Sequence, residues 1–235
     1  MARGWRGEGG QHQGARPYQE DSWALRTLGD GSLLAVVADG MGGHAGGAVA
    51  SKIGGETFVH SIEQGGGLSD GLQDANDAVR RGAAGKPDLA GMGATLVAAQ
   101  VRGDEVRWIS VGDSPFFLIS LGRIERLNAD HSMVPQIEAM VKRGMLTAEE
   151  AERHPARHTL REAVMGEKLT LIDRGSRRLE PDARLLLCSD GVQTLSEAAI
   201  YAVAVRPVQG LIDAVLAAAA EHQDNVTAIK LERVR

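Results

Sequence analysis

The sequence predicts an α+β protein in which pairs of helices pack over antiparallel β-sheets. Its short apolar runs of β type are separated by glycine-containing joints of three residues. Such joints connect antiparallel neighbours, because a parallel crossover needs about a dozen residues. The helical segments come as sequential pairs. Hydrophobic residues make up 43% of the 235 and charged residues 24%, so the chain can bury a core, and we expect one domain over residues 1–235.

Seven runs are predicted to form strands, because they are rich in apolar residues and are bounded by turn residues. They cover residues 22–28, 33–38, 95–101, 106–111, 116–121, 184–189 and 226–231. Residues 33–38 and 185–188 are continuously apolar, which indicates buried strands. Hairpin loops are expected at 29–31, 102–104 and 121–123.

Two helix pairs are predicted. In residues 47–64 and 69–84, apolar residues recur at spacings of three and four, which gives each helix one face to bury. Residues 196–205 and 211–222 are predicted to form the second pair. Between the pairs, residues 147–150 have the pattern of a capping box, which predicts a short helix that Pro155 ends.

Composition excludes several classes of protein. The net charge of −5 leaves no basic stripe for a phosphate backbone, so we expect no nucleic-acid partner. Residues 1–13 are polar, and no apolar run approaches the roughly 20 residues that span a bilayer, so we expect a cytoplasmic monomer without membrane contact. Cys188 is the only cysteine. It can form no internal disulfide or multi-thiolate zinc site, and we interpret it as a core residue.

Acidic residues stand at the ends of the predicted strands. Three lead into a run and three follow one: Glu20, Asp21, Asp224, Asp39, Asp113 and Asp190. If these ends meet, the carboxylates repel one another unless a cation neutralises them. An all-oxygen ligand set suits Mg²⁺ or Mn²⁺ rather than zinc or copper. Gly40 follows Asp39, and a glycine carbonyl can approach an ion closely. Asp-Gly after a strand is also a common turn, so spacing alone leaves both interpretations open.

Seven short motifs follow one another in a recognisable order. They are Arg16-Pro17-Tyr18-Gln19-Glu20-Asp21, Val37-Ala38-Asp39-Gly40-Met41-Gly42-Gly43-His44, Gly93-Ala94-Thr95, Val111-Gly112-Asp113-Ser114, Asp130-His131-Ser132, Cys188-Ser189-Asp190-Gly191 and Asp224-Asn225-Val226-Thr227. This order resembles the bacterial type of the protein phosphatase 2C (PPM-type) family over nearly the whole chain. The resemblance implies a four-layer α-β-β-α sandwich, two antiparallel sheets flanked by helix pairs, with a variable flap at about 128–167.

The resemblance also implies two ion sites, for Mn²⁺ or Mg²⁺, that share Asp39. Asp190 and Asp224 would complete one site. The other would be served, largely through bound water, by Glu20 or Asp21 and the carbonyl of Gly40. Asp113 with Asp190 would match a more weakly held third ion.

The chemistry that the resemblance implies is hydrolysis of phosphoserine and phosphothreonine monoesters in proteins. A water between two cations would attack phosphorus directly, and no side chain would act as the nucleophile. Arg16 resembles the arginine that grips the substrate phosphate, a task for which its planar fork is suited. The leaving-group proton could come from His44 or from a metal-bound water, although His44 also fits a surface or helix-capping role. The partners would be phosphoproteins and a cognate serine/threonine kinase or its targets.

Two departures from the family pattern and three rival interpretations remain. Gln19 stands where asparagine is more frequent, and Pro115 stands where an arginine often follows Gly-Asp-Ser. Residues 40–45 fit a dinucleotide-binding fingerprint, which would indicate an oxidoreductase, although Asp39 would repel the pyrophosphate. A catalytically silent module of the same fold could bind a phosphoprotein without cleaving it. A specialised phosphatase could act on a regulatory phosphoserine protein.

Overall fold

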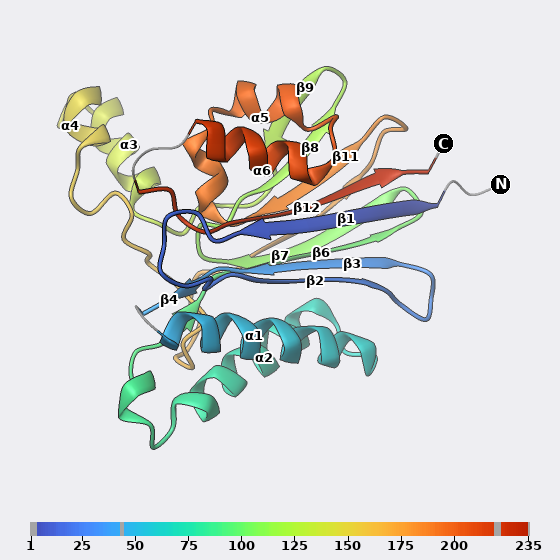
Figure 1. Cartoon of the computed structure of the whole chain (residues 1–235), viewed down its shortest axis with the longest axis horizontal. Coiled ribbons are helices and arrows are strands. Elements are labelled where there is room, and N and C mark those ends of the chain that lie inside the picture. The colour runs from blue at the N-terminus through green and yellow to red at the C-terminus, as the bar shows by residue number, and fades with distance from the viewer. Residues whose placement is uncertain (1–3, 43–44, 219–221, 235) are drawn as a thin grey trace.

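A computed structural model describes residues 4–42, 45–218 and 222–234 of the chain. These residues form two five-stranded antiparallel sheets stacked face to face, with a pair of helices on each outer face (Figure 1). The layers therefore follow the order α-β-β-α, which confirms the predicted fold class. A small helical flap projects from one end of the sandwich.

Sheet A has the strand order β1-β12-β11-β8-β9. Its strands are β1 (Trp5–His12), β8 (Phe116–Ser120), β9 (Arg123–Arg126), β11 (Arg184–Cys188) and β12 (Val226–Arg233). Helices α5 (Glu197–Val203) and α6 (Val208–Ala217) cover its outer face through an apolar cluster. Residues 219–221, near the end of the predicted last helix, lie outside the described residues.

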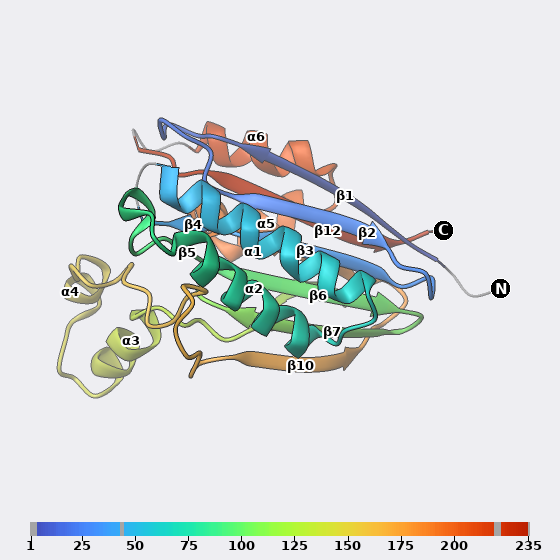
Figure 2. The ribbon, with the colours of Figure 1, turned by 90° about the horizontal axis from the view of Figure 1, so that it is seen from below.

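Sheet B has the order β10-β7-β6-β3-β2. Its strands are β2 (Ser22–Thr27), β3 (Leu33–Ala38), β6 (Leu96–Arg102), β7 (Glu105–Val111) and β10 (Asp173–Arg178). Helices α1 (Ala45–Glu63) and α2 (Leu68–Ala83) run side by side beneath it (Figure 2). A short ladder joins β4 (Gly40–Met41) to β5 (Gly93–Ala94), and the chain also has two 3₁₀ turns, η1 (Pro87–Leu89) and η2 (Asp190–Thr194).

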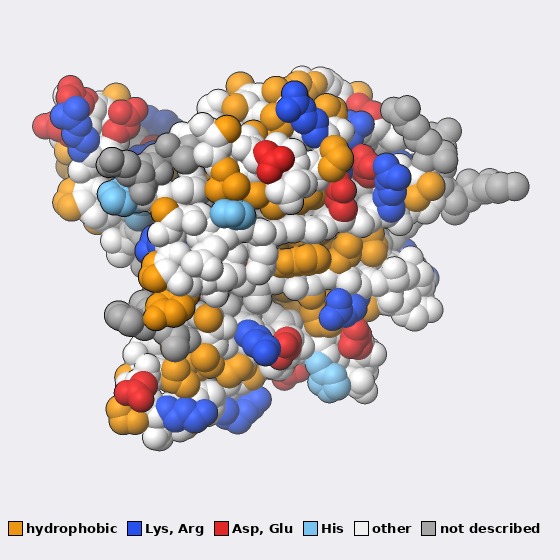
Figure 3. Space-filling view, in the orientation of Figure 1, with side chains coloured by type: hydrophobic (Ala, Val, Ile, Leu, Met, Phe, Trp, Pro, Cys, Tyr) orange, Lys and Arg blue, Asp and Glu red, His pale blue; other side chains and the backbone are white. Residues whose placement is uncertain are grey.

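The flap contains α3 (Val134–Lys142) and α4 (Ala148–Glu152), of which only α4 was predicted. The capping box is present: Thr147 Oγ1 accepts from the Glu150 amide, and the Glu150 carboxylate accepts from the Thr147 amide. Acidic and basic side chains are mixed on the projecting flap, at the upper left of Figure 3. None of the helices in the described ranges is both long and apolar enough to cross a bilayer.

Strand β3 shows why the central strands are so apolar. Leu34, Val36 and Ala38 pack in the cluster between sheet B and helices α1 and α2. Leu33 and Val37 pack between the two sheets. A strand covered on both faces has no solvent side, so polar residues do not alternate with apolar ones. The predicted hairpins also form, and the β8–β9 turn has positive φ at both Leu121 and Gly122, as a tight two-residue hairpin requires.

Of the strands in the two large sheets, three were not predicted, and all three lie at sheet edges: β1, β9 and β10. The two-residue strands β4 and β5 were not predicted either. Edge strands are half-exposed and carry charged residues, so they lack the apolar signal of central strands. Two of them also contain glycines that lie against indole rings. A Cβ on Gly9 of β1 would lie 2.5 Å from the Trp23 ring, and a Cβ on Gly175 of β10 would overlap the Trp108 ring. These glycines made β1 and β10 hard to predict as strands. Their lack of a side chain is nevertheless what allows the indole rings to pack there.

We expect Gly175→Val to destabilise the protein by about 1–3 kcal/mol, because overpacking forces the buried Trp108 out of place. The Trp108 indole is further held by a hydrogen bond of 2.9 Å to Asp173. The free energy of unfolding in urea measures the change. Ser176→Val, at the next and exposed position of the strand, is the matched control. Equal stability of the two variants would contradict the packing argument.

Candidate active site

The antiparallel register brings the strand-end acidic residues to one end of the sandwich. The first residue of β2 pairs with the last of β3, and the last residue of β11 pairs with the third of β12. The end of β7 lies beside the start of β6 at the same end. This is the left end in Figure 1, where β4 and the flap lie. Five aspartates therefore gather there: Asp21, Asp39, Asp113, Asp190 and Asp224.

Asp21 connects the two sheets at this end. Its Oδ2 accepts hydrogen bonds from the Ser189 hydroxyl at 2.8 Å and the Thr227 hydroxyl at 2.7 Å. Both donors belong to the end of sheet A, whereas Asp21 precedes β2 of sheet B. Asp39 Oδ2 also lies 3.4 Å from the Asp190 amide nitrogen of the opposite sheet. Strands that are far apart in sequence thus place their carboxylates in one cluster.

The electrostatics of the cluster are those of crowded carboxylates. Burial raises the pKa of Asp39 well above its usual value, and the charges of Asp190, Asp21, Asp113 and Asp224 raise it further. Burial, helped by the neighbouring acids, likewise raises the pKa of Asp21 to about 6 and that of Asp113 to about 7. Burial and Asp224 raise the pKa of Asp190. Asp39 is thus the member that interacts with all the others.

Arg16 reaches the cluster from the loop between β1 and β2. Its guanidinium lies 2.5 Å from Asp224 Oδ2, and this hydrogen bond raises the arginine pKa. The charges of Glu20 and Asp190 act in the same direction. About half of the Arg16 side chain, 52%, is exposed. The structure therefore brings Arg16 to the predicted site but pairs it with a predicted metal ligand.

Gly40 has a packing role that the sequence did not reveal. Its amide donates to the Glu20 carbonyl at 3.2 Å, and a Cβ at this position would collide with the Gly47 carbonyl of α1. A Cβ on Gly47 would in turn lie 2.6 Å from Glu20 Oε1. The carboxylate of Glu20 therefore lies against the first turn of α1. The glycines are needed because three chain segments meet at this point.

The donors of the cluster suit hard divalent cations. Asp21 Oδ1 is buried and has no hydrogen-bond partner among the described residues, which leaves an oxygen available to a ligand. The mutual repulsion described above would be relieved by positive charge. Within the described part of the chain, no three His, Cys, Asp or Glu side chains are close enough to hold an ion by themselves. Magnesium retains several waters of its own, so direct ligands can be few.

Beside the site lie residues that the sequence did not single out, Arg126 among them. A groove of about 420 Å³ extends from Asp113 and Asp190 between the flap and α5. Its walls include Arg126, Asp130, Arg157, His158 and Ile200. Asp130 belongs to a motif recognised in the sequence, but Arg126 carried no signal because its partners come from the loops around it. Ser189 and Thr227 were visible only as parts of motifs.

Three further predictions concern Cys188, His44 and a dinucleotide-binding sheet. Cys188 is fully buried in β11, and burial raises the pKa of its thiol, which confirms it as a core residue. His44 lies outside the described residues. The pairings in both large sheets are antiparallel, so the described residues supply none of the parallel β-α-β units of a dinucleotide-binding sheet.

Comparison with known proteins gives consistent results. A family profile described as Protein phosphatase 2C matches residues 7–227. The serine/threonine protein phosphatase PstP of Mycobacterium tuberculosis is 34% identical over 213 residues, covering 85% of this chain and 40% of PstP. The chain thus spans less than half the length of that relative. The serine/threonine phosphatase stp of Listeria monocytogenes is 28% identical over 233 residues, covering 93% of this chain and 91% of stp.

Solved structures share the fold closely. The catalytic domain of PstP in complex with two manganese ions has a TM-score of 0.82 at 28% identity, and the match covers 98% of this chain and 99% of that one. The PPM phosphatase MsPP of Mycobacterium smegmatis, in complex with cacodylate, has a TM-score of 0.79 at 28% identity, with 97% of each chain covered. Motif order, fold and carboxylate cluster therefore agree with the sequence matches, and the chain belongs to the protein phosphatase 2C family of serine/threonine phosphatases.

Proposed function

We propose that this chain is a metal-dependent phosphatase that hydrolyses phosphoserine and phosphothreonine in proteins. The observation that carries the proposal is the convergence of aspartates from both sheets at one end, where burial and mutual repulsion raise their pKa values. At neutral pH such a cluster calls for divalent cations, and its oxygen donors suit Mn²⁺ or Mg²⁺. Two manganese ions in the similar PstP domain support the same cofactor.

In this proposal Asp39 would serve two ion positions, since its carboxylate lies where the two sheets meet, 3.4 Å from the Asp190 amide nitrogen. Asp190 and Asp224 complete one position. Glu20 or Asp21, with the carbonyl of Gly40, completes the other. When bound, the two ions would lower the pKa of a water and neutralise charge on the phosphoryl oxygens.

Asp113, next to Asp190, adds a third and weaker ion position. The hydroxyls of Ser189 and Thr227 hold Asp21 in place through Oδ2, which orients Oδ1 before any ligand arrives. Arg16 contributes a planar donor group at the exposed edge of the cluster, where a phosphate dianion can reach it. The residues of the chain thus hold charge and orient ligands, and none needs to form a covalent intermediate.

We further propose one domain over residues 1–235, with a flap at about 128–167, that works as a cytoplasmic monomer opposite a serine/threonine kinase. The outer face of each sheet is covered by its own helix pair, which leaves no open sheet face for a second copy. The net charge of −5 and the mixed charges of the flap favour protein substrates over nucleic acid.

Phosphate release after chelation tests the proposal. The purified protein is stripped of metal and assayed with a phosphothreonine peptide and an aryl phosphate, and Mn²⁺, Mg²⁺, Ca²⁺ and Zn²⁺ are then added back singly. We expect no release without metal and recovery with Mn²⁺ or Mg²⁺. Absence of release with every cation, while the phosphopeptide still binds, would support a silent binding module of the same fold instead.

Arg16→Ala is expected to raise the KM for a phosphopeptide about tenfold and to change kcat less, because a charge-assisted contact to phosphate contributes mainly to binding. Steady-state kinetics at saturating Mn²⁺ measure both constants. Arg6→Ala is the matched control, since Arg6 is an exposed arginine paired with Glu232 of β12. A loss of kcat with unchanged KM would contradict the assigned role of Arg16.

A further inference from the structure

Arg126, the last residue of β9, makes three directed contacts beside the proposed active site. Its guanidinium donates to the backbone carbonyl of Asp113 at 2.7 Å, to Asp130 Oδ2 at 3.2 Å and to Asn128 Oδ1 at 3.3 Å. Only 20% of its side chain and 16% of that of Asp130 are exposed. The three acceptors lie in the loop after β7 and in the chain that leads into the flap. Arg126 therefore bridges these two segments.

The first residues of the flap, around His131, are also bonded through their backbone to the loop that carries Asp113. The His131 amide donates to the Gly112 carbonyl at 3.2 Å, and the Gly112 amide donates to His131 Nδ1 at 3.3 Å. The returning end of the flap is tied to the same place, because the Arg161 amide donates to the His131 carbonyl at 2.8 Å. Both ends of the flap thus converge on the loop that carries Asp113.

A buried hydrogen-bond chain extends this connection to the centre of the cluster. Asn128 Nδ2 donates to the Ser114 carbonyl at 2.9 Å, and the Ser114 and Thr95 hydroxyls lie 2.7 Å apart. Thr95 Oγ1 then accepts from the Asp39 amide at 3.1 Å. Because these groups are buried, breaking any one contact leaves a polar atom unsatisfied. We therefore expect this series of hydrogen bonds to be kept or lost together.

The Asp113 loop does not itself supply this guanidinium. Pro115 follows Gly-Asp-Ser, where a proline side chain offers no donor. The cation that holds the Asp113 loop comes instead from the neighbouring strand. A planar guanidinium can serve three acceptors from fixed directions, whereas a lysine ammonium is a single point of charge on a flexible stem.

Resting on the proposed function, we propose that Arg126 is a positioning residue that couples the flap to Asp113. Arg126 also lines the groove of about 420 Å³, together with Asp113 and with Arg157 and His158 of the flap. A substrate polypeptide in this groove touches the flap side, while Asp113 faces the ion side. Because Arg126 is bonded to both segments, a polypeptide that contacts the flap also affects the position of the Asp113 carboxylate.

Two substrates and a binding measurement test this coupling. Arg126→Gln is compared with the intact protein by Mn²⁺ titration calorimetry and by KM values for a phosphothreonine peptide and an aryl phosphate. We expect the weakest Mn²⁺ binding step to weaken about tenfold. The KM for the peptide should rise about tenfold, whereas that for the small aryl phosphate, which does not reach the flap, should not change. Arg126→Lys should recover part of both effects.

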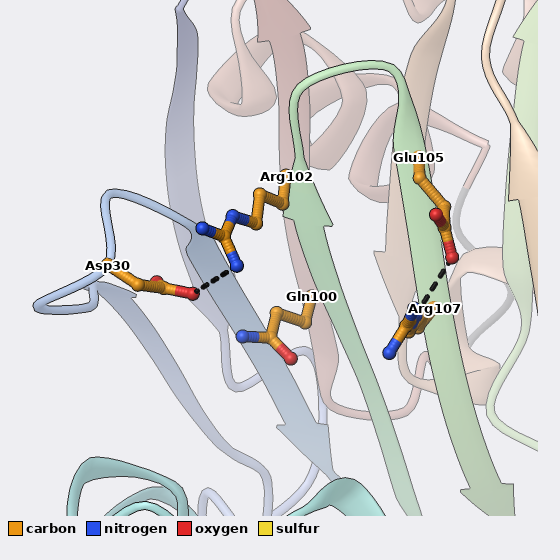
Figure 4. Close-up of a pocket in the computed structure, with 5 residues that line it drawn as sticks. All are labelled: Asp30, Gln100, Arg102, Glu105 and Arg107. Atoms are coloured by element: carbon orange, nitrogen blue, oxygen red, sulfur yellow. Dashed lines mark hydrogen bonds and ion pairs between the residues drawn. The ribbon is translucent and has the colours of Figure 1, made fainter.

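Arg107→Gln is the matched control. Arg107 pairs with Glu105 (Figure 4). It lies near the β6–β7 turn, at the end of sheet B opposite the aspartate cluster. If Arg126→Gln and Arg107→Gln give the same Mn²⁺ titration and the same ratio of peptide to aryl phosphate KM, the coupling is refuted. If Arg126→Gln does not fold, an Arg126→Lys variant indistinguishable from wild type refutes it equally. Failure of the intact protein to release phosphate would refute the proposed function, while the calorimetric comparison would still test the coupling.

Discussion

Asp39→Ala is expected to reduce phosphate release at least about a thousandfold, because it removes the carboxylate that serves both proposed ion positions. Each cation contributes several kcal/mol to stabilising the transition state, and each 1.4 kcal/mol corresponds to about a factor of ten in rate. The measurement is kcat with an aryl phosphate and with a phosphopeptide at saturating Mn²⁺. Both substrates should lose activity to the same extent, since the defect lies in the ions and not in substrate contacts.

The stability of this variant separates a catalytic defect from misfolding. The pKa of Asp39 is raised by burial and by four other aspartates, so its negative charge destabilises the metal-free fold. Removing it should leave thermal stability in chelator equal to or higher than that of the wild type. Asp213→Ala, an exposed aspartate on α6 held only by Gln209, is the matched control and should retain full activity. Near-normal turnover by the Asp39 variant would overturn the proposed site.

In the absence of metal, the contribution of the aspartate cluster to the stability of the protein should fall as the pH rises from about 4 to 7. The pKa values of Asp21 and Asp113 in the folded protein are raised to about 6 and about 7. Well below pH 4 both groups are protonated in folded and unfolded chains alike. As the pH rises, the unfolded chain loses these protons first, so stability is lost until the folded pKa values are passed. Saturating Mn²⁺ at a hundred times its Kd should restore about 2.7 kcal/mol.

Two variants of residues whose pKa values shift in opposite directions test the direction of this pH dependence. Asp113→Asn should stabilise the metal-free protein by about 2 kcal/mol at pH 8, once partial exposure is allowed for, and by nothing near pH 4. Asp182→Asn should behave oppositely, because hydrogen bonds from Ser120 and Leu121 lower the pKa of Asp182. Its contribution is present above the unfolded pKa and is lost in acid. Thermal unfolding in chelator at both pH values measures these differences, and a less stable Asp113→Asn at pH 8 would contradict the electrostatic picture.

The sequence was most informative where strands are covered on both sides. Runs such as 33–38 and 185–188 have no solvent face, so their continuous apolar character identified them and their ends predicted the positions of Asp39 and Asp190. The edge strands could not be recognised in this way. Their glycines are explained only by the indole rings of Trp23 and Trp108, which are brought to them by tertiary packing.

The active site likewise combines residues that local sequence identifies with contacts that only the tertiary structure shows. Acidic residues at strand ends could be identified from local pattern, but the contacts that organise them connect distant parts of the chain. Asp21 and Thr227 are separated by 206 positions, and Arg16 and Asp224 by 208. No local pattern predicts that these side chains meet. Arg126 went unrecognised for a related reason, since its three acceptors are defined by how two loops fold over β9.

The position of β12 between β1 and β11 has a consequence for how the protein is made. Strand β1 has no ladder partner in sheet A until residues 226–233 have been synthesised. Sheet B, built from residues 22–178, can close much earlier. A nascent or prematurely terminated chain that stops before Asp224 therefore has an open edge and an incomplete ion site. Dephosphorylating activity should consequently emerge only once β12 has been translated, which keeps shorter products of synthesis inactive.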